Sequence, residues 1–227
     1  ISAQRASRPR SMGSLYWQLN DAWTSISWSS IDYLGNKKAL HYKLSEIYAP
    51  ILLGLDIKGR DLYDVWVSND LQRDIDGRVR IIVEDMEGNQ MFAFSEKADV
   101  KANSCYRLPN KVNINTLNKK KSECYARIIF MEDDTILSER IHFFTYPKDL
   151  ELIETEINPN VSFKNGKYYI EFTTDVFVKD LYIEASERGD FSRNFFDVIP
   201  NVTQTVIFDP EDKNRKDVKF NLHIYNR

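Results

Sequence analysis

Three of the four tryptophans of this chain lie close together near its beginning, and their side chains are the ones best suited to binding a ligand. Trp17, Trp23 and Trp28 fall within twelve residues of one another. Indole rings stack on the apolar C–H faces of sugars, and Asn20 and Asp21 would add polar groups that orient a sugar. The segment therefore indicates a carbohydrate pocket. Packing of the same rings in a core is the alternative, and it is favoured for Trp23 and Trp28.

Two pairs of adjacent acidic residues could supply acid–base or nucleophilic groups: Glu84 with Asp85 and Asp133 with Asp134. A retaining glycosidase needs two carboxyl groups about 5–5.5 Å apart on either side of the scissile bond. Neighbouring side chains on a strand point to opposite faces, so such pairs rarely converge on one substrate. We therefore expect solvated acids and no catalytic pair within this chain.

The histidines and cysteines give no metal-binding pattern. His41, His142 and His223 are far apart in sequence and lack the spacing of zinc ligands, so we expect neither a metal nor any other cofactor. Cys105 and Cys124 fall on predicted strands. They could form one disulfide in an exported protein, but two separate buried thiols are the favoured alternative.

Composition indicates an ordinary globular chain of about two domains. It has 227 residues, 42% of them hydrophobic, and a formal net charge of −3. A nearly balanced charge argues against a broad surface for nucleic acid, which needs clustered cations. No apolar run approaches the roughly 20 residues that would cross a bilayer. The chain starts without Met or an apolar signal core, so we expect targeting information to be absent or removed, and we expect the basic residues 1–10 to form a surface segment.

Trp17, Trp23 and Trp28 lie in a short region that cannot form a core by itself. Large residues at consecutive positions in 15–20 predict a strand covered on both faces. Leu40, Leu44, Ile47 and Tyr48 share one face of a helix predicted over 36–48, which Pro50 ends. One strand and one helix leave these apolar faces unburied, so residues 1–50 are interpreted as part of something larger.

Short strands with alternating apolar residues follow, and they predict two antiparallel sandwiches of immunoglobulin type. The polar segment around Pro147 separates a first domain, 51–147, from a second, 148–227. The first is predicted to have strands near 51–57, 62–69, 79–83, 91–95, 100–108, 124–130 and 136–144. The second is predicted to have strands near 161–163, 168–173, 178–184, 202–208 and 218–225, the last having the clearest alternation.

The first fifty residues resemble a known family in the order and spacing of their motifs. The matching stretches are MGSLYWQLND at 12–21, Trp23, SWSSIDY at 27–33 and KALHY at 38–42. Over residues 5–50 they are similar to the end of the catalytic barrel of β-mannosidases in glycoside hydrolase family two. FSRNFFDVIP at 191–200 is similar to a stretch in the last sandwich of those enzymes. Ala22 departs from the pattern, because many relatives have Cys there.

The resemblance implies a fold that is mainly β: two immunoglobulin-like β-sandwich domains preceded by the last strand and helix of a (β/α)8 barrel. Residues 1–50 would be the barrel remnant, with 15–18 as its eighth strand. Trp17 matches the strand-end tryptophan that lies against the sugar in the family, and Asn20 and Asp21 match the loop that follows. The two catalytic glutamates of the family lie upstream of this chain.

The resemblance also implies a function for a larger parent enzyme. That enzyme would hydrolyse terminal non-reducing β-D-mannose residues with retention and without a cofactor, whereas this chain alone would be inactive. Its partners would be β-mannosides, the missing barrel of its own chain, and a second copy in a homodimer. Its location would be extracytoplasmic: bacterial periplasm, secreted, or lysosomal in a eukaryote. The alternatives are a non-catalytic carbohydrate-binding or adhesion module and a related exo-glycosidase such as an exo-glucosaminidase.

Overall fold

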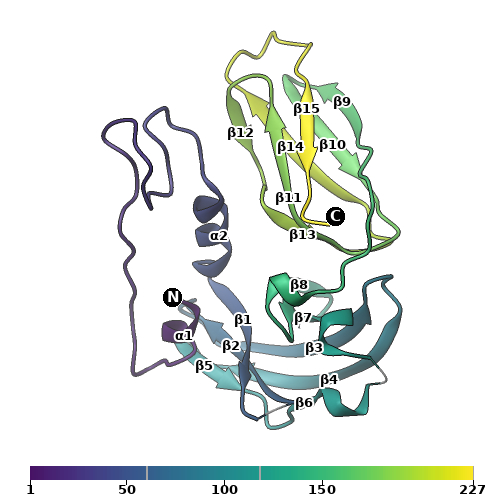
Figure 1. The fold of residues 1–227 in the computed structure, drawn as a ribbon. Coiled ribbons are helices and arrows are strands. Elements are labelled where there is room, and N and C mark those ends of the chain that lie inside the picture. The colour runs from purple at the N-terminus through teal and green to yellow at the C-terminus, as the bar shows by residue number, and fades with distance from the viewer. Residues whose placement is uncertain (60, 118, 227) are drawn as a thin grey trace. The chain divides into compact units, whose positions relative to one another are not determined.

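A computed structural model describes residues 1–59, 61–117 and 119–226 of the chain (Figure 1). Antiparallel sheets dominate it, which confirms that the fold is mainly β. The chain divides into two compact units. The first unit comprises residues 1–85 and 90–150, and the second comprises residues 86–89 and 151–227.

The first unit contains two four-stranded sheets, whose strands closely follow the predicted ones. One sheet has the order β1-β2-β5, with β6 also paired to β2, and the other has the order β4-β3-β7-β8. The strands are β1 (Ile51–Ile57), β2 (Leu62–Asn69), β3 (Ile75–Asp85), β4 (Gln90–Val100), β5 (Ser104–Arg107), β6 (Val112–Asn113), β7 (Cys124–Glu132) and β8 (Thr135–Phe143). Single-turn 3-10 helices lie in the segments between β6 and β7 and after β8: η1 (Ile114–Thr116), η2 (Lys121–Glu123) and η3 (Pro147–Asp149).

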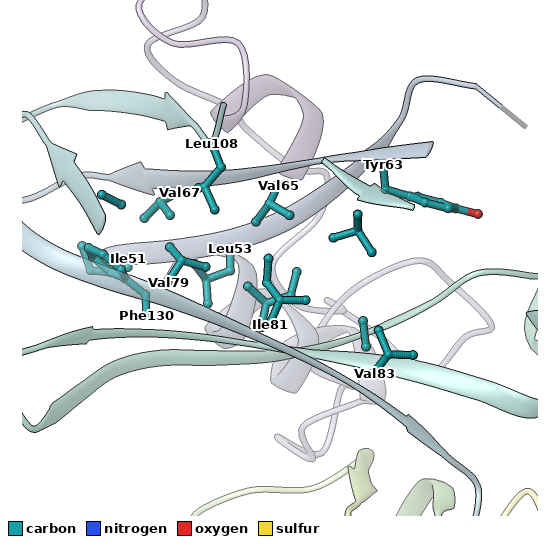
Figure 2. Packing of buried hydrophobic residues seen from close by; sticks show 14 of the residues in the cluster. Ile51, Leu53, Tyr63, Val65, Val67, Val79, Ile81, Val83, Leu108 and Phe130 are labelled. Carbon is teal, nitrogen blue, oxygen red and sulfur yellow. The ribbon is translucent and has the colours of Figure 1, made fainter. Parts of the chain in front are cut away.

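Alternating residues of the two sheets form the core of this unit, as Figure 2 shows. Every second side chain of a strand points to the same face, so the apolar positions of each sheet meet those of the other. The labelled core residues are Ile51, Leu53, Tyr63, Val65 and Val67 of β1 and β2, Val79, Ile81 and Val83 of β3, Leu108, and Phe130 of β7. The period-two alternation seen in the sequence therefore identified the buried face.

Gly54 permits the indole of Trp66 to lie across β1. The two residues are directly opposite in the β1–β2 ladder, and a Cβ placed on Gly54 would fall on the indole ring. We expect Gly54→Ala to lower the free energy of unfolding by about 1–3 kcal/mol, because the buried ring must move. Urea denaturation measures this change. Gly59→Ala is the matched control, since its Cβ would meet only the Leu62 Cβ at 3.8 Å; equal effects of the two changes would contradict the explanation.

The second unit has two further sheets with their own core. Their orders are β12-β14-β10-β9 and β13-β11-β15. The strands are β9 (Asn160–Lys164), β10 (Lys167–Phe172), β11 (Val178–Ala185), β12 (Gly189–Phe191), β13 (Phe196–Val198), β14 (Gln204–Pro210) and β15 (Phe220–His223). The core residues are Tyr168, Ile170, Phe172, Val178, Leu181, Ile183, Phe196, Val198, Val206, Phe208 and Val218.

The strand with the clearest alternation is shorter than predicted. Residues 218–225 were expected to be extended and paired, but β15 covers only Phe220–His223. Its partner β11 pairs with it from Tyr182 to Ala185. Beyond this ladder the backbone N–H of Tyr225 donates to the Lys179 carbonyl at 3.1 Å, but residues 224 and 225 are not part of the strand.

The strand predicted over residues 15–20 is not formed. Residues 11–19 are in neither helix nor strand, and Asn20 makes only an isolated bridge to Ile31. Ladder hydrogen bonds require a neighbouring strand, and no strand lies alongside this part of the described chain. Leu15, Trp17 and Leu19, which suggested a doubly covered strand, are instead exposed, and Leu15 retains 98% of its accessible surface; Tyr16 is partly buried.

The helix predicted over 36–48 is present as α2 (Ala39–Ile47), three residues shorter at its start. Lys37 forms an antiparallel bridge with Ile31, so the backbone before Ala39 is extended rather than helical. Leu44 is the fully buried member of the predicted apolar face, whereas Leu40 and Tyr48 are exposed. A four-residue helix, α1 (Ser2–Arg5), precedes the tryptophan segment. No helix in the described residues is long and apolar enough to cross a membrane.

Candidate functional site

Trp17 stands on the surface of the first unit. Its side chain is 78% exposed, and its peptide bond to Gln18 is cis. Trp23 and Trp28 are 70% and 72% exposed, so neither packs in a core within this chain, contrary to the favoured alternative. Trp66 is the buried tryptophan, and its indole N–H donates to the Asp56 carboxylate at 3.1 Å. The three exposed rings remain available to a ligand or to a further protein surface.

Asp21 does not face solvent. It is 6% exposed and accepts a hydrogen bond from the Ser27 hydroxyl and one from the Lys38 ammonium, the latter at 3.0 Å. The hydrogen bond from Ser27, with those from Lys38 and Ser29, holds the pKa of the Asp21 carboxyl below its usual range despite burial. Asp21 is therefore an anionic structural group inside the loop after Trp17. The structure gives it no exposed oxygen with which to act on a substrate.

Asn20 lies at the surface of the same loop. Its side-chain amide donates to the backbone carbonyl of Asp21 at 3.2 Å. The backbone carbonyl of Asn20 accepts a hydrogen bond from the Gln18 side-chain amide at 2.8 Å. Asn20 also makes the parallel bridge to Ile31. These contacts shape the loop, which is the role that the resemblance assigned to Asn20. Whether Asn20 or Trp17 touches a sugar stays a prediction.

The acid pairs that were considered as catalytic groups lie on strands and turns. Glu84 and Asp85 are consecutive residues of β3, and Glu84 accepts from the Arg127 guanidinium at 3.2 Å. Asp85 has the Lys119 ammonium 3.8 Å away. Asp133, whose φ is 51°, and Asp134 form the turn between β7 and β8. Within the described residues, therefore, each member of the first pair is matched with a cation, and the second pair sits in a tight turn.

The two cysteines are separate thiols, as the favoured alternative held. Cys105 lies on β5 and Cys124 begins β7. Burial raises the pKa of each thiol to about 11, so both are protonated at neutral pH and are poor nucleophiles.

The three histidines lie on different elements. They fall on α2, β8 and β15. Burial, with a further contribution from Arg140, lowers the pKa of His142 to about 3, so this ring is neutral at pH 7. Across residues 1–59, 61–117 and 119–226, no three His, Cys, Asp or Glu side chains are grouped so that they could hold a metal ion.

Sequence reasoning missed the role of Arg5, because residues 1–10 were expected to form a surface segment. Its side chain is 5% exposed, and its guanidinium donates to the carbonyls of Ile47 and Ala49, each at 2.7 Å, and of Pro50 at 3.2 Å. It also pairs with the Asp70 carboxylate at 2.8 Å. The neighbouring Ala6 packs on Leu52 and Trp66. No spacing in the sequence separates Arg5 from the other early arginines.

Comparison with known protein families gives a match for each of the two sandwich domains. Residues 61–149 match the family described as mannosidase Ig/CBM-like domain, and residues 152–226 match the Ig-fold domain family. Together the two matches cover more than half of the chain, and they confirm two immunoglobulin-like domains in the predicted order. The resemblance to β-mannosidases of glycoside hydrolase family two is confirmed with them.

Curated relatives match most of the chain. β-Mannosidase A of Neosartorya fischeri is 28% identical over an alignment of 227 positions, which covers 92% of this chain and 24% of the relative. β-Mannosidase of Mus musculus is 28% identical over 196 residues, which span 82% of this chain and 22% of the relative. This chain thus spans about a quarter of the length of the curated relatives that it matches.

Solved structures share the fold of the chain. The β-D-mannosidase of Dictyoglomus thermophilum superposes with a TM-score of 0.83 at 20% identity, over 99% of this chain and 28% of that one. The exo-chitosanase of Amycolatopsis orientalis superposes with a TM-score of 0.70 at 12% identity, over 95% of this chain and 30% of that one. Likeness at these identities establishes the fold and leaves the sugar open.

Proposed function

We propose that this chain is the C-terminal accessory region of an exo-β-mannosidase that removes terminal non-reducing β-D-mannose with retention of configuration. One observation carries the proposal: a mannosidase Ig/CBM-like domain and an Ig-fold domain follow one another in this chain, and β-mannosidase relatives align with 92% of it. The two sandwiches would brace a catalytic barrel supplied by upstream sequence. That barrel would hold the acid and the nucleophile that retention requires about 5–5.5 Å apart.

The exposed segment around Trp17 supports the partner that we assign. Leu15, Trp17, Trp23, Ile26 and Trp28 are each at least 70% exposed, which is unusual for a contiguous stretch of large apolar residues. Burying such side chains stabilises a fold by roughly 1.5–3 kcal/mol each. Sequence of the same polypeptide upstream of residue 1 is the partner that would cover this surface, with the face of Trp17 left for the mannose ring. A homodimer is the other way to cover it.

Parent activity is tested by expressing this chain with and without the upstream sequence of its gene. We expect the longer polypeptide to release p-nitrophenol from p-nitrophenyl β-D-mannoside, and this chain alone to release none. Release by this chain alone would contradict the proposal. Hydrolysis of the β-D-glucosaminide in preference to the mannoside would replace the assigned sugar with that of an exo-glucosaminidase.

A non-catalytic carbohydrate module is the second candidate, because three tryptophan rings are exposed. Titration of this chain with mannose and manno-oligosaccharides separates it from the first. We expect no saturable binding, since one indole without the rest of a pocket offers too little contact to offset the loss of freedom on binding.

An extracytoplasmic location of the parent enzyme, in the periplasm, outside the cell or in a lysosome, belongs to the proposal of an exo-β-mannosidase.

A further inference from the structure

The ammonium of Lys38 lies among three oxygens of the loop that follows Trp17. Its Nζ is 2.7 Å from the Ser29 Oγ, 3.0 Å from the Asp21 Oδ2 and 3.5 Å from the Ser27 Oγ. Lys38 immediately precedes α2, so this contact ties the loop to the start of the helix. An ammonium has three donors, and here all three have an acceptor within reach.

The contact matters because the groups that receive it are buried. Asp21 and Ser29 are 6% and 2% exposed, although the loop around them carries apolar side chains on its outside. A buried carboxylate that loses its cation keeps its desolvation penalty, and Asp21 would then have only serine hydroxyl groups to offset it. Loss of Lys38 would therefore open the loop rather than leave Asp21 charged and enclosed.

Ser30 extends the same set of contacts to both neighbours of Trp17. The Ser30 hydroxyl lies 3.1 Å from the Tyr16 hydroxyl, and its backbone N–H donates to the carbonyl of Gln18 at 3.2 Å. The Ser30 carbonyl accepts from the backbone N–H of Lys38 at 2.9 Å. Tyr16 and Gln18 are thus fixed to a fully buried serine, which is itself fixed to Lys38.

Trp17 depends on these contacts, since its own side chain has little packing. A ring that is 78% exposed is placed by its backbone, and that backbone is neither helical nor part of a strand. We infer that the Lys38 side chain is a positioning residue for Trp17, acting through its hydrogen bonds to Asp21 and to Ser29, the residue before Ser30. The inference rests on the proposed function insofar as Trp17 contacts the sugar. The role of Lys38 in holding the loop closed rests only on its hydrogen bonds to Asp21 and Ser29.

Hydrogen exchange of this chain tests the loop directly. The amides of Asp21, Ser30 and Ile31 donate to carbonyls of the loop at 3.0–3.2 Å and report its closure. We expect Lys38→Met to speed their exchange tenfold or more, and the double change Asp21→Asn with Lys38→Met to recover part of the protection, because no buried charge remains. Lys43→Met is the matched control, since Lys43 pairs with Glu46 on an exposed face of α2. Exchange within twofold of the parent in Lys38→Met would overturn the inference.

Kinetics of the longer polypeptide test the consequence for Trp17. With rates expressed per folded enzyme, we expect Lys38→Met to lower kcat/KM for an aryl β-mannoside tenfold or more, the double change to recover at least threefold, and Lys43→Met to match the parent. Faster exchange with unchanged kcat/KM would overturn the positioning role. If the longer parent hydrolyses no mannoside, the proposed function fails, whereas the exchange measurement still decides whether Lys38 holds the loop.

Discussion

Replacing Arg5 by methionine is expected to destabilise the first unit by about 2–4 kcal/mol. The guanidinium satisfies three backbone carbonyls at the end of α2 and pairs with Asp70, all within 3.2 Å. The Ile47 carbonyl is one that the end of a helix leaves without an intrahelical partner, and Arg5 supplies donors to it and to the Ala49 carbonyl from 42 and 44 residues away. Methionine fills a similar volume but donates nothing, so these two partly buried carbonyls would lose the Arg5 donor, whereas the Pro50 carbonyl would keep the backbone N–H of Asp70 at 2.9 Å.

Urea denaturation, with amide exchange followed over β1 and β2, measures the loss. Arg10→Met is the control, because Arg10 is exposed and belongs to the same basic stretch. Arg5→Lys should fall between the two, since an ammonium keeps the charge but cannot reproduce the planar fork that reaches several acceptors at once. Surface substitutions usually change the free energy of unfolding by no more than about 0.5 kcal/mol. If Arg5→Met changes it by no more than that, the contacts to α2 make no net contribution to stability.

Replacing Trp17 by alanine in the longer polypeptide is expected to lower kcat/KM for a β-mannoside by tens- to thousands-fold, at about 1.4 kcal/mol per tenfold change. The expected cause is loss of the indole face against which the C–H face of the sugar would stack. Because the ring is 78% exposed in this chain, the same change should leave the free energy of unfolding of the isolated chain almost unaffected. A large kinetic effect with a small effect on stability is the signature of a binding residue.

Steady-state kinetics on an aryl β-mannoside provides the measurement. Trp17→Phe should retain part of the activity, since a smaller aromatic face still stacks. Tyr146→Ala is the matched control: its aromatic ring is 73% exposed but precedes η3, in the connection between the two sandwiches. An unchanged kcat/KM in Trp17→Ala would remove Trp17 from the substrate site.

The sandwich strands could be predicted because each carries its own signal. In β3, Val79, Ile81 and Val83 occupy every second position, and all three are in the core. Alternation can be recognised without knowing the partner strand, because successive side chains of any strand point to opposite faces of the sheet. It failed at the strand limits, which pairing sets: β15 pairs with β11 only over Phe220–His223, and no local property of residues 218–225 records where that pairing stops.

The candidate segment shows the same division between local and non-local information. Its motif order indicated the β-mannosidase resemblance, and its composition indicated aromatic binding. Only the folded chain showed that Asp21 is enclosed by Ser27 and Lys38, and that Arg5, not Arg10, is buried. Residue type does not distinguish one loop serine or one arginine from the next.

The sequence by itself determined the fold class, the alternating strands of both sandwiches and the family resemblance. The strands depend on the periodicity of side chains along one segment, and the resemblance depends on the order and spacing of motifs along the chain. The tertiary structure alone decided that residues 15–20 form no strand, that Arg5 closes the end of α2, and that Lys38 holds the loop after Trp17. Each of these depends on hydrogen bonds and buried charges supplied by residues distant in the chain, and such partners leave no period in the sequence that they join.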